Sequence, residues 1–126
     1  MAIEFKEKQN TDEEIFNILN PIVKRWFKEK FKTFAIPQKY AIMEVHSRNN
    51  VLVSAPTGSG KTLIADYIIS REIKQKIRVI YTAPIKALSN QKYKDFCKDY
   101  GEENIGILTG DTVKNPNATI LIMTTE

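Results

Sequence analysis

The chain has 126 residues, of which 42% are hydrophobic and 27% are charged, proportions typical of a globular domain rather than a disordered tail. A single cysteine, Cys97, and a single histidine, His46, exclude an internal disulfide framework and a Cys/His zinc site. We interpret Cys97 as a core residue and His46 as a helix-surface residue, and we expect a cytoplasmic protein. The longest aliphatic run, residues 120–123, is too short to cross a bilayer, and residues 1–8 do not resemble a secretory signal.

Lys and Arg outnumber Asp and Glu by 19 to 15, which gives a net charge of +4. The excess is spread evenly along the chain, so it permits an anionic partner without proving one. The densest basic run, residues 24–32, is interpreted as a solvated helix face, with a phosphate contact as the alternative.

The chain before residue 50 has a helical pattern. Thr11 and Glu14 form a capping-box pair that predicts the start of a short helix. Pro21 is expected at the first turn of a second helix. A third is predicted from Pro37 to about Ser47, and its apolar face carries Ala41, Ile42 and Val45.

After residue 50, short apolar segments alternate with helical patterns. Strands are predicted at 51–53, 79–81, 105–108 and 119–123, and helices at 60–74 and 85–100, the latter ended by Gly101. The expected inward side chains are Leu63, Ile64, Tyr67 and Ile68 in the first helix, and Leu88, Tyr93, Phe96, Cys97 and Tyr100 in the second. The alternation predicts an α/β fold with a parallel sheet and flanking helices.

Residues 55–62, Ala-Pro-Thr-Gly-Ser-Gly-Lys-Thr, lie between a predicted strand and a predicted helix. This is the Walker A arrangement with Ala55 in place of the first glycine, and it predicts a phosphate-binding loop. Lys61 is expected to reach the β- and γ-phosphates, and the Thr62 hydroxyl to ligate Mg²⁺, which makes these two the predicted catalytic residues. The predicted nucleotide-binding residues of the loop are Ala55, Pro56, Thr57, Gly58, Ser59, Gly60, Lys61 and Thr62. The alternative is a glycine-containing turn with a surface lysine.

From about residue 20 to its end, the chain resembles the first RecA-like domain of superfamily 2 DExH-box helicases. The resemblance is carried by residues 34–38 (Phe-Ala-Ile-Pro-Gln), 55–62, 81–93, 106–111 (Gly-Ile-Leu-Thr-Gly-Asp), and 116–118 with 122–126. Residues 81–93 and the last block look most like exosome-associated Ski-type RNA helicases, and residues 21–27 are also similar to large helicase-related proteins. The resemblance implies an ATP-dependent helicase, an ATP hydrolase that uses ATP and Mg²⁺ and binds single-stranded nucleic acid. The Ski-type likeness favours RNA over DNA.

The resemblance also implies roles for single residues. Gln38 stands where such helicases read adenine, whose N6 donor and N7 acceptor match a side-chain amide; the alternative is a polar helix residue after Pro37. The nucleic-acid backbone is expected at the carboxyl edge of the sheet, where helix N–H groups and a lysine suit phosphate, although a simple helix start is the alternative for residues 84–88. The implied residues are Pro84, Lys86, Ala87, Thr109, Gly110, Thr124 and Thr125. Asp111 is interpreted as a turn or cap residue.

The Asp-Glu-x-His motif, which in this family holds Mg²⁺ on a later strand, does not follow the loop in these residues. We therefore expect a helical lead-in over 1–48 that carries Gln38, and a partial RecA-like ATP-binding domain over 49–126, truncated before that motif. Such a chain alone is expected to have little or no ATPase activity. Its 51–53 strand would lack neighbours, which a missing C-terminal part or a second chain would supply.

Two other functions are compatible with parts of the sequence. One is a non-catalytic module that binds ATP or nucleic acid, or half of a split helicase that acts only with a partner chain. The other is a small P-loop kinase or GTPase. The latter is disfavoured because no Asn-Lys-x-Asp guanine-reading motif follows and residues 84–88 would be unexplained.

Overall fold

The computed structural model describes residues 3–19, 21, 24–25, 28, 34–56 and 58–125. Most of the predicted second helix, most of the basic run, and Thr57 lie outside the described residues. The chain forms two compact units, residues 1–68 and residues 69–126. Within the described part of the chain, the helices are too short or too polar to cross a membrane.

The first unit begins with helix α1, Asp12–Ile18, whose start is set by its capping box. The Thr11 hydroxyl accepts from the Glu14 N–H at 3.2 Å, and the Glu14 carboxylate accepts from the Thr11 N–H at 3.0 Å. The bond from the Thr11 backbone, the largest cause, holds the pKa of the Glu14 carboxyl below its usual range. The predicted helix start is confirmed.

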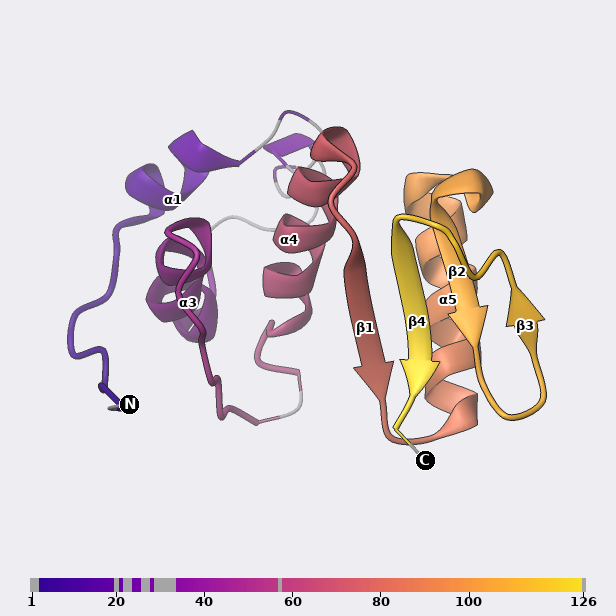
Figure 1. Ribbon diagram of the computed structural model, residues 1–126. Helices are drawn as coiled ribbons and strands as arrows, with labels where there is room; N and C mark the ends of the chain where they lie inside the picture. The colour runs from indigo at the N-terminus through magenta and orange to yellow at the C-terminus, as the bar shows by residue number, and fades with distance from the viewer. Residues whose placement is uncertain are drawn as a thin grey trace. The chain divides into compact units, whose positions relative to one another are not determined.

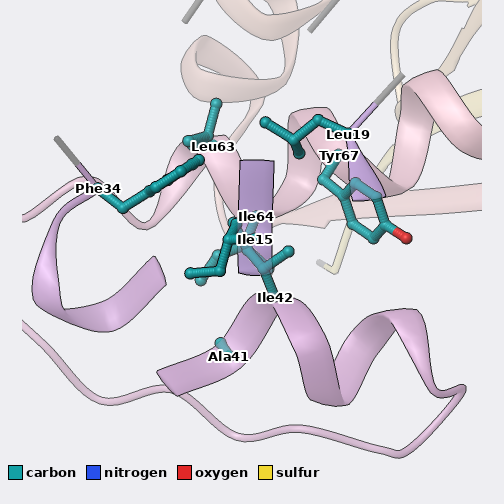
Figure 2. Packing of buried hydrophobic residues seen from close by; sticks show 8 residues of the cluster. All are labelled: Ile15, Leu19, Phe34, Ala41, Ile42, Leu63, Ile64 and Tyr67. Carbon is teal, nitrogen blue, oxygen red and sulfur yellow. The ribbon is translucent and has the colours of Figure 1, made fainter. Parts of the chain in front are cut away.

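Helices α3, Ile36–His46, and α4, Thr62–Gln75, confirm two further predicted helices to within about two residues. Side chains from α1, α3 and the first half of α4 converge in one apolar cluster (Figure 2). Its members are Ile15, Leu19, Phe34, Ala41, Ile42, Leu63, Ile64 and Tyr67. The exposed His46 hydrogen-bonds through Nδ1 to the hydroxyl of Tyr67, so it also connects α3 to α4.

The predicted strand at 51–53 is wrong. These residues have no regular secondary structure, and Leu52 is 92% exposed. A strand is stabilised by hydrogen bonds to a neighbour, and none of the described strands pairs with this segment. Its apolar composition indicated a buried strand, but composition does not supply the partner.

The second unit contains a four-stranded sheet of order β1-β4-β2-β3 (Figure 1). Its strands are β1, Val79–Ala83, β2, Ile105–Leu108, β3, Val113–Lys114, and β4, Ile120–Thr124. β4 pairs in parallel with β1 on one side and with β2 on the other, and β3 runs antiparallel to β2. The sheet is thus mostly parallel, as predicted. β3 was missed because two exposed residues leave no hydrophobic pattern.

Helix α5, Lys86–Tyr100, packs against β1, β4 and β2 (Figure 1). It ends at Gly101, as predicted. Its Phe96 lies edge-to-face with Tyr81 of β1, at 5.3 Å between ring centroids. The buried core here consists of Ile69, Phe96, Ile105, Ile107, Ile120 and Ile122, with Tyr93, Cys97 and Tyr100 packed at its margin.

One predicted inward residue of α5 is wrong. Leu88 is 48% exposed, whereas Ser89 is fully buried. Ser89, Tyr93, Phe96 and Tyr100 follow one helix face at four- and three-residue spacing, and Leu88 lies one residue off this stripe. The serine takes the core position because its hydroxyl can bond to the Ile85 carbonyl oxygen, at 3.3 Å.

Candidate functional site

The loop at residues 55–61 turns on two glycines in the left-handed region of backbone conformation. Gly58 has φ of 82° and Gly60 has φ of 90°, values that residues with a Cβ rarely adopt. A Cβ on Gly58 would meet nothing within 4 Å, whereas a Cβ on Gly60 would lie 2.7 Å from Nε2 of Gln38. Gly58 is therefore required by its backbone alone, and Gly60 by both its backbone and its surroundings.

Hydrogen bonds within the loop keep it folded. The Ser59 N–H and hydroxyl both donate to the Pro56 carbonyl oxygen, at 3.2 and 2.5 Å. The Lys61 ammonium donates to the carbonyl oxygen of Ala55, which links the two ends of the loop. Lys61 is exposed, so a phosphate oxygen can replace that carbonyl as its acceptor.

Gln38 connects the loop to the first turn of α3. Its Oε1 accepts from the Ala35 N–H and its Nε2 donates to the Gly60 carbonyl oxygen, both at 2.8 Å. The side chain is 3% exposed. Its amide has a second N–H and a second lone pair, which is the capacity that adenine recognition requires.

A pocket of about 950 Å³ opens beside the loop, within the first unit. Its size is that of a pocket for a small molecule such as a nucleoside. It is lined by α3, by residues 4–6, and by residues 49–56 together with Ser59. Tyr40 and Phe5 belong to this lining, and no motif in the sequence singles them out.

One carboxylate of the pocket wall is held by two partners. Glu44 accepts from the Asn49 side chain at 2.8 Å and pairs with the Lys6 ammonium at 3.3 Å. The bond from Asn49, and then the contact with Lys6, hold the pKa of the Glu44 carboxyl below its usual range. The pocket wall therefore carries a charge that is already compensated.

Among the residues that the structure describes, no three His, Cys, Asp or Glu side chains gather as a metal site. Thr62 is exposed at the start of α4, next to the loop. Because Mg²⁺ in phosphate sites keeps several waters and few protein ligands, this arrangement fits an ion carried by a nucleotide.

In the second unit, the predicted nucleic-acid residues lie at one edge of the sheet. β1, β2 and β4 are mutually parallel, so their carboxyl ends meet at the same edge (Figure 1). Pro84, Thr109 and Thr125 directly follow these three strands, and the Thr125 N–H donates to the Ala83 carbonyl oxygen at 3.0 Å. Lys86 and Ala87 begin α5 beside them.

Lys86 reaches the turn that follows β2. Its Nζ lies 2.7 Å from Oδ2 of Asp111, and 3.7 Å from the place of a Cβ on Gly110. The Thr109 hydroxyl caps the turn, because it accepts from the Asp111 N–H at 3.3 Å and from the Thr112 N–H at 3.0 Å. The cap of this turn is thus Thr109, and the Asp111 carboxylate is the partner of Lys86.

Comparison with known proteins gives a consistent result. The family model described as DEAD/DEAH box helicase matches residues 35–126. The chain is 48% identical over 89 residues to "ATP-dependent RNA helicase mtr4" of Schizosaccharomyces pombe, covering 71% of this chain and 8% of that protein. It is 43% identical over 113 residues to "Antiviral helicase SKI2" of Saccharomyces cerevisiae, covering 90% and 8%. It is 35% identical over 142 aligned residues to "ATP-dependent helicase Lhr-Core" of Methanocaldococcus jannaschii, covering 94% and 17%.

Two solved structures share the fold. A hypothetical ATP-dependent RNA helicase from Sulfolobus tokodaii aligns with a TM-score of 0.66 and 23% identity, over 84% of this chain and 34% of that chain. The DUF1998 helicase MrfA, solved with DNA and AMPPNP, aligns with a TM-score of 0.73 and 22% identity, over 97% and 19%. The chain spans a small part of each of these proteins.

Proposed function

Because the chain belongs to the DEAD/DEAH box helicase family, we propose that it is the ATP-binding segment of an ATP-dependent RNA helicase. The observation that carries this proposal is the loop at 55–62, whose glycines have the backbone conformation that a phosphate cradle needs. The pocket beside it has the volume of a small-molecule site. The cytoplasmic location expected from the sequence is part of the same proposal.

ATP is proposed to bind with its phosphates in the loop. The N–H groups around Gly58 and Gly60 and the start of α4 offer donors and a positive potential. Lys61 exchanges its bond to Ala55 for one to the β- and γ-phosphates, and Thr62 gives its hydroxyl to Mg²⁺. When bound, Mg²⁺ neutralises phosphate charge. Gln38 is proposed to read the adenine edge.

Single-stranded nucleic acid is proposed to bind along the carboxyl edge of the second unit's sheet. The N–H groups at the start of α5 and the Lys86 ammonium suit a backbone phosphate. Pro84, Ala87, Thr109, Gly110, Thr124 and Thr125 are proposed to line this path. We propose RNA rather than DNA as the substrate, because relatives such as mtr4 are named as RNA helicases.

Turnover is proposed to need residues beyond these 126. Phosphoryl transfer requires Mg²⁺ held from two sides and a positioned water, and no Asp-Glu-x-His follows the loop here. The test measures phosphate release by the purified 126-residue chain and by Lys61→Ala, with and without single-stranded RNA. We expect neither to exceed background. Turnover that Lys61→Ala abolishes would show that the chain is catalytically complete.

A second proposal concerns residues 51–54, which could pair with a strand from elsewhere. This irregular segment lines the pocket and leaves Leu52 almost fully exposed. Exposed backbone that belongs to no sheet can accept a strand from elsewhere, and none of the described strands pairs with this segment. We propose that a strand from a second chain, or from another part of the protein, pairs here. Self-association measured by light scattering, and abolished by Leu52→Glu, would identify that strand as a second copy.

A further inference from the structure

We propose that Asp111 acts as a built-in competitor for Lys86. In the free protein its carboxylate holds the ammonium that a nucleic-acid phosphate has to capture. Asp111 thereby sets the affinity and the salt dependence of the nucleic-acid edge. This inference rests on the proposed nucleic-acid function and adds to it a residue that controls the contact.

The first support is the distance and exposure of the pair. Lys86 Nζ and Asp111 Oδ2 are 2.7 Å apart, and the two side chains are 43% and 73% exposed. An ion pair in contact with water at both ends is weak. A phosphate can therefore replace the carboxylate without first breaking a buried contact.

The second support is that the carboxylate is held in place by its turn. The Thr109 N–H donates to the Thr112 carbonyl oxygen at 2.8 Å, and the Thr109 hydroxyl caps the turn from inside. Thr109, which supplies the capping hydroxyl, is buried, while Gly110 and Asp111 of the same turn are exposed. Asp111 thus projects from an ordered turn, beside Gly110, where a Cβ would make only ordinary contact with the end of the Lys86 side chain, at 3.7 Å.

The consequence is electrostatic. A phosphate that approaches the start of α5 meets a lysine whose charge is already compensated, and a carboxylate that repels it. Binding exchanges the Lys86–Asp111 pair for a Lys86–phosphate pair, and the carboxylate returns to water. A weakly bound polyanion gains little when it replaces Asp111 as the partner of Lys86. The Lys86–Asp111 pair therefore lowers the non-specific binding of polyanions.

The test compares five variants of the 126-residue chain with the wild type: Asp111→Asn, Asp111→Glu, Lys86→Ala, the double variant Asp111→Asn/Lys86→Ala, and Asp99→Asn. Asp99 is exposed in the last turn of α5, so its variant has the same net charge as Asp111→Asn. The probe is a fluorescently labelled short oligouridylate, and its anisotropy is measured between about 50 and 200 mM salt.

We expect Asp111→Asn to bind about threefold more tightly than the wild type at the lowest salt. We also expect its plot of log K against log salt to be steeper by about 0.7, the value for one more phosphate contact on a single strand. In the Lys86→Ala background, Asp111→Asn should change neither the affinity nor the slope. Asp99→Asn should bind as the wild type does. Asp111→Glu, which keeps the carboxylate, should also bind as the wild type does.

The results that would contradict the competitor role of Asp111 differ from those that would contradict the nucleic-acid edge itself. If Lys86→Ala weakens binding but Asp111→Asn behaves as Asp99→Asn, the competitor role is wrong and the nucleic-acid edge stands. If the chain does not bind the probe, or Lys86→Ala binds as the wild type does, the proposed edge itself is wrong and the inference falls with it. Thermal unfolding followed by circular dichroism separates either result from a loss of folding.

Discussion

The side chain of Gln38 donates a hydrogen bond of 2.8 Å to the carbonyl oxygen of Gly60. Its other end accepts from the Ala35 N–H, so one buried amide connects the start of α3 to the phosphate-binding loop. A buried amide that loses either partner leaves a polar group unsatisfied. The conformation of the loop therefore depends on a residue that lies 22 positions earlier in the sequence.

Gly60→Ala is expected to lower the free energy of unfolding more than Gly58→Ala. Both glycines have positive φ, so both variants carry the same backbone strain, about 1 kcal/mol. Only at Gly60 does the new Cβ press on Gln38, at 2.7 Å, and on the Ala35 Cβ, at 3.0 Å. Urea denaturation of the two variants measures the difference, expected to be about 1–2 kcal/mol.

The contact between a Cβ at position 60 and the Gln38 amide predicts that the effects of Gly60→Ala and Gln38→Ala on the free energy of unfolding are coupled. In a Gln38→Ala background the amide is gone, so Gly60→Ala should cost less than it does in the wild type and should exceed Gly58→Ala only by the contact with the Ala35 Cβ at 3.0 Å. Additive effects of Gln38→Ala and Gly60→Ala would show that the two residues do not act through each other.

Gln38→Ala is also expected to reduce the preference for ATP over GTP. A site that hydrogen-bonds a base discriminates against analogues that leave its polar groups unpaired, and a methyl group at position 38 removes that penalty. Competition of the two nucleotides against a fluorescent ATP analogue measures the preference. A selectivity that survives in Gln38→Ala would assign adenine reading to another part of the pocket.

The capping box of α1 predicts a pH dependence. The pKa of Glu14 is lowered in the folded chain from its usual 4.5, so its contribution is complete above that value and is lost as the pH falls through the lowered pKa. At neutral pH, Glu14→Ala should destabilise the chain more than Glu13→Ala, which removes an equal charge without the Thr11 bond. The gap between the two variants in denaturant titrations should close as the pH falls below 4.5 and through the lowered pKa of Glu14, while a gap of constant size would contradict the assignment.

Thr11 supplies the other half of this cap. Thr11→Ala removes the acceptor for the Glu14 N–H and is expected to cost about 1 kcal/mol of stability. Thr11→Ser keeps the hydroxyl and should cost little, and an equal loss in both variants would point away from capping.

Local signals in the sequence predicted the helices within the described residues, and most strands, well. The Thr11–Glu14 spacing, Gly101, and the apolar runs at 105–108 and 120–123 each carry their structure within a few residues. The segment 51–53 failed because a strand needs a neighbour that its own residues do not contain. Leu88 failed because a fully buried serine took the core position that hydrophobicity alone assigned to leucine.

A side chain at position 106 is expected to lower the free energy of unfolding, which the neighbouring sequence does not reveal. A Cβ there would lie 2.1 Å from the backbone oxygen of Asn115. Asn115 cannot easily move, because its side chain donates to the carbonyl oxygens of Glu103 and Ile105 at 3.2 and 3.3 Å. Gly106→Ala should therefore cost about 3 kcal/mol or more.

Gly110→Ala is the matched control, since its Cβ would meet only the end of the Lys86 side chain, at 3.7 Å. It should leave the free energy of unfolding within about 1 kcal/mol of the wild type. Equal melting temperatures for the two variants would contradict the close approach at Gly106.

The candidate site was only partly predictable. The loop at 55–62 is a local motif, so its residues could be named from the sequence alone. The contacts of Gln38 with Gly60 and of Lys86 with Asp111 join positions 22 and 25 apart, and only the fold brings them together. The pocket residues Tyr40 and Phe5 have no sequence signal, because a pocket wall needs shape rather than a particular residue type.

Binding of Mg·ATP to the 126-residue chain tests the central claim most directly. Calorimetry compares the wild type with Lys61→Ala and with Lys74→Ala, which removes an exposed lysine from the last turn of α4, the helix that follows the loop. We expect the wild type and Lys74→Ala to bind with the same Kd. Lys61→Ala should bind at least about tenfold more weakly, the effect of losing a charge-assisted hydrogen bond. Equal affinity of Lys61→Ala and Lys74→Ala would contradict a phosphate-binding role for the loop at 55–62.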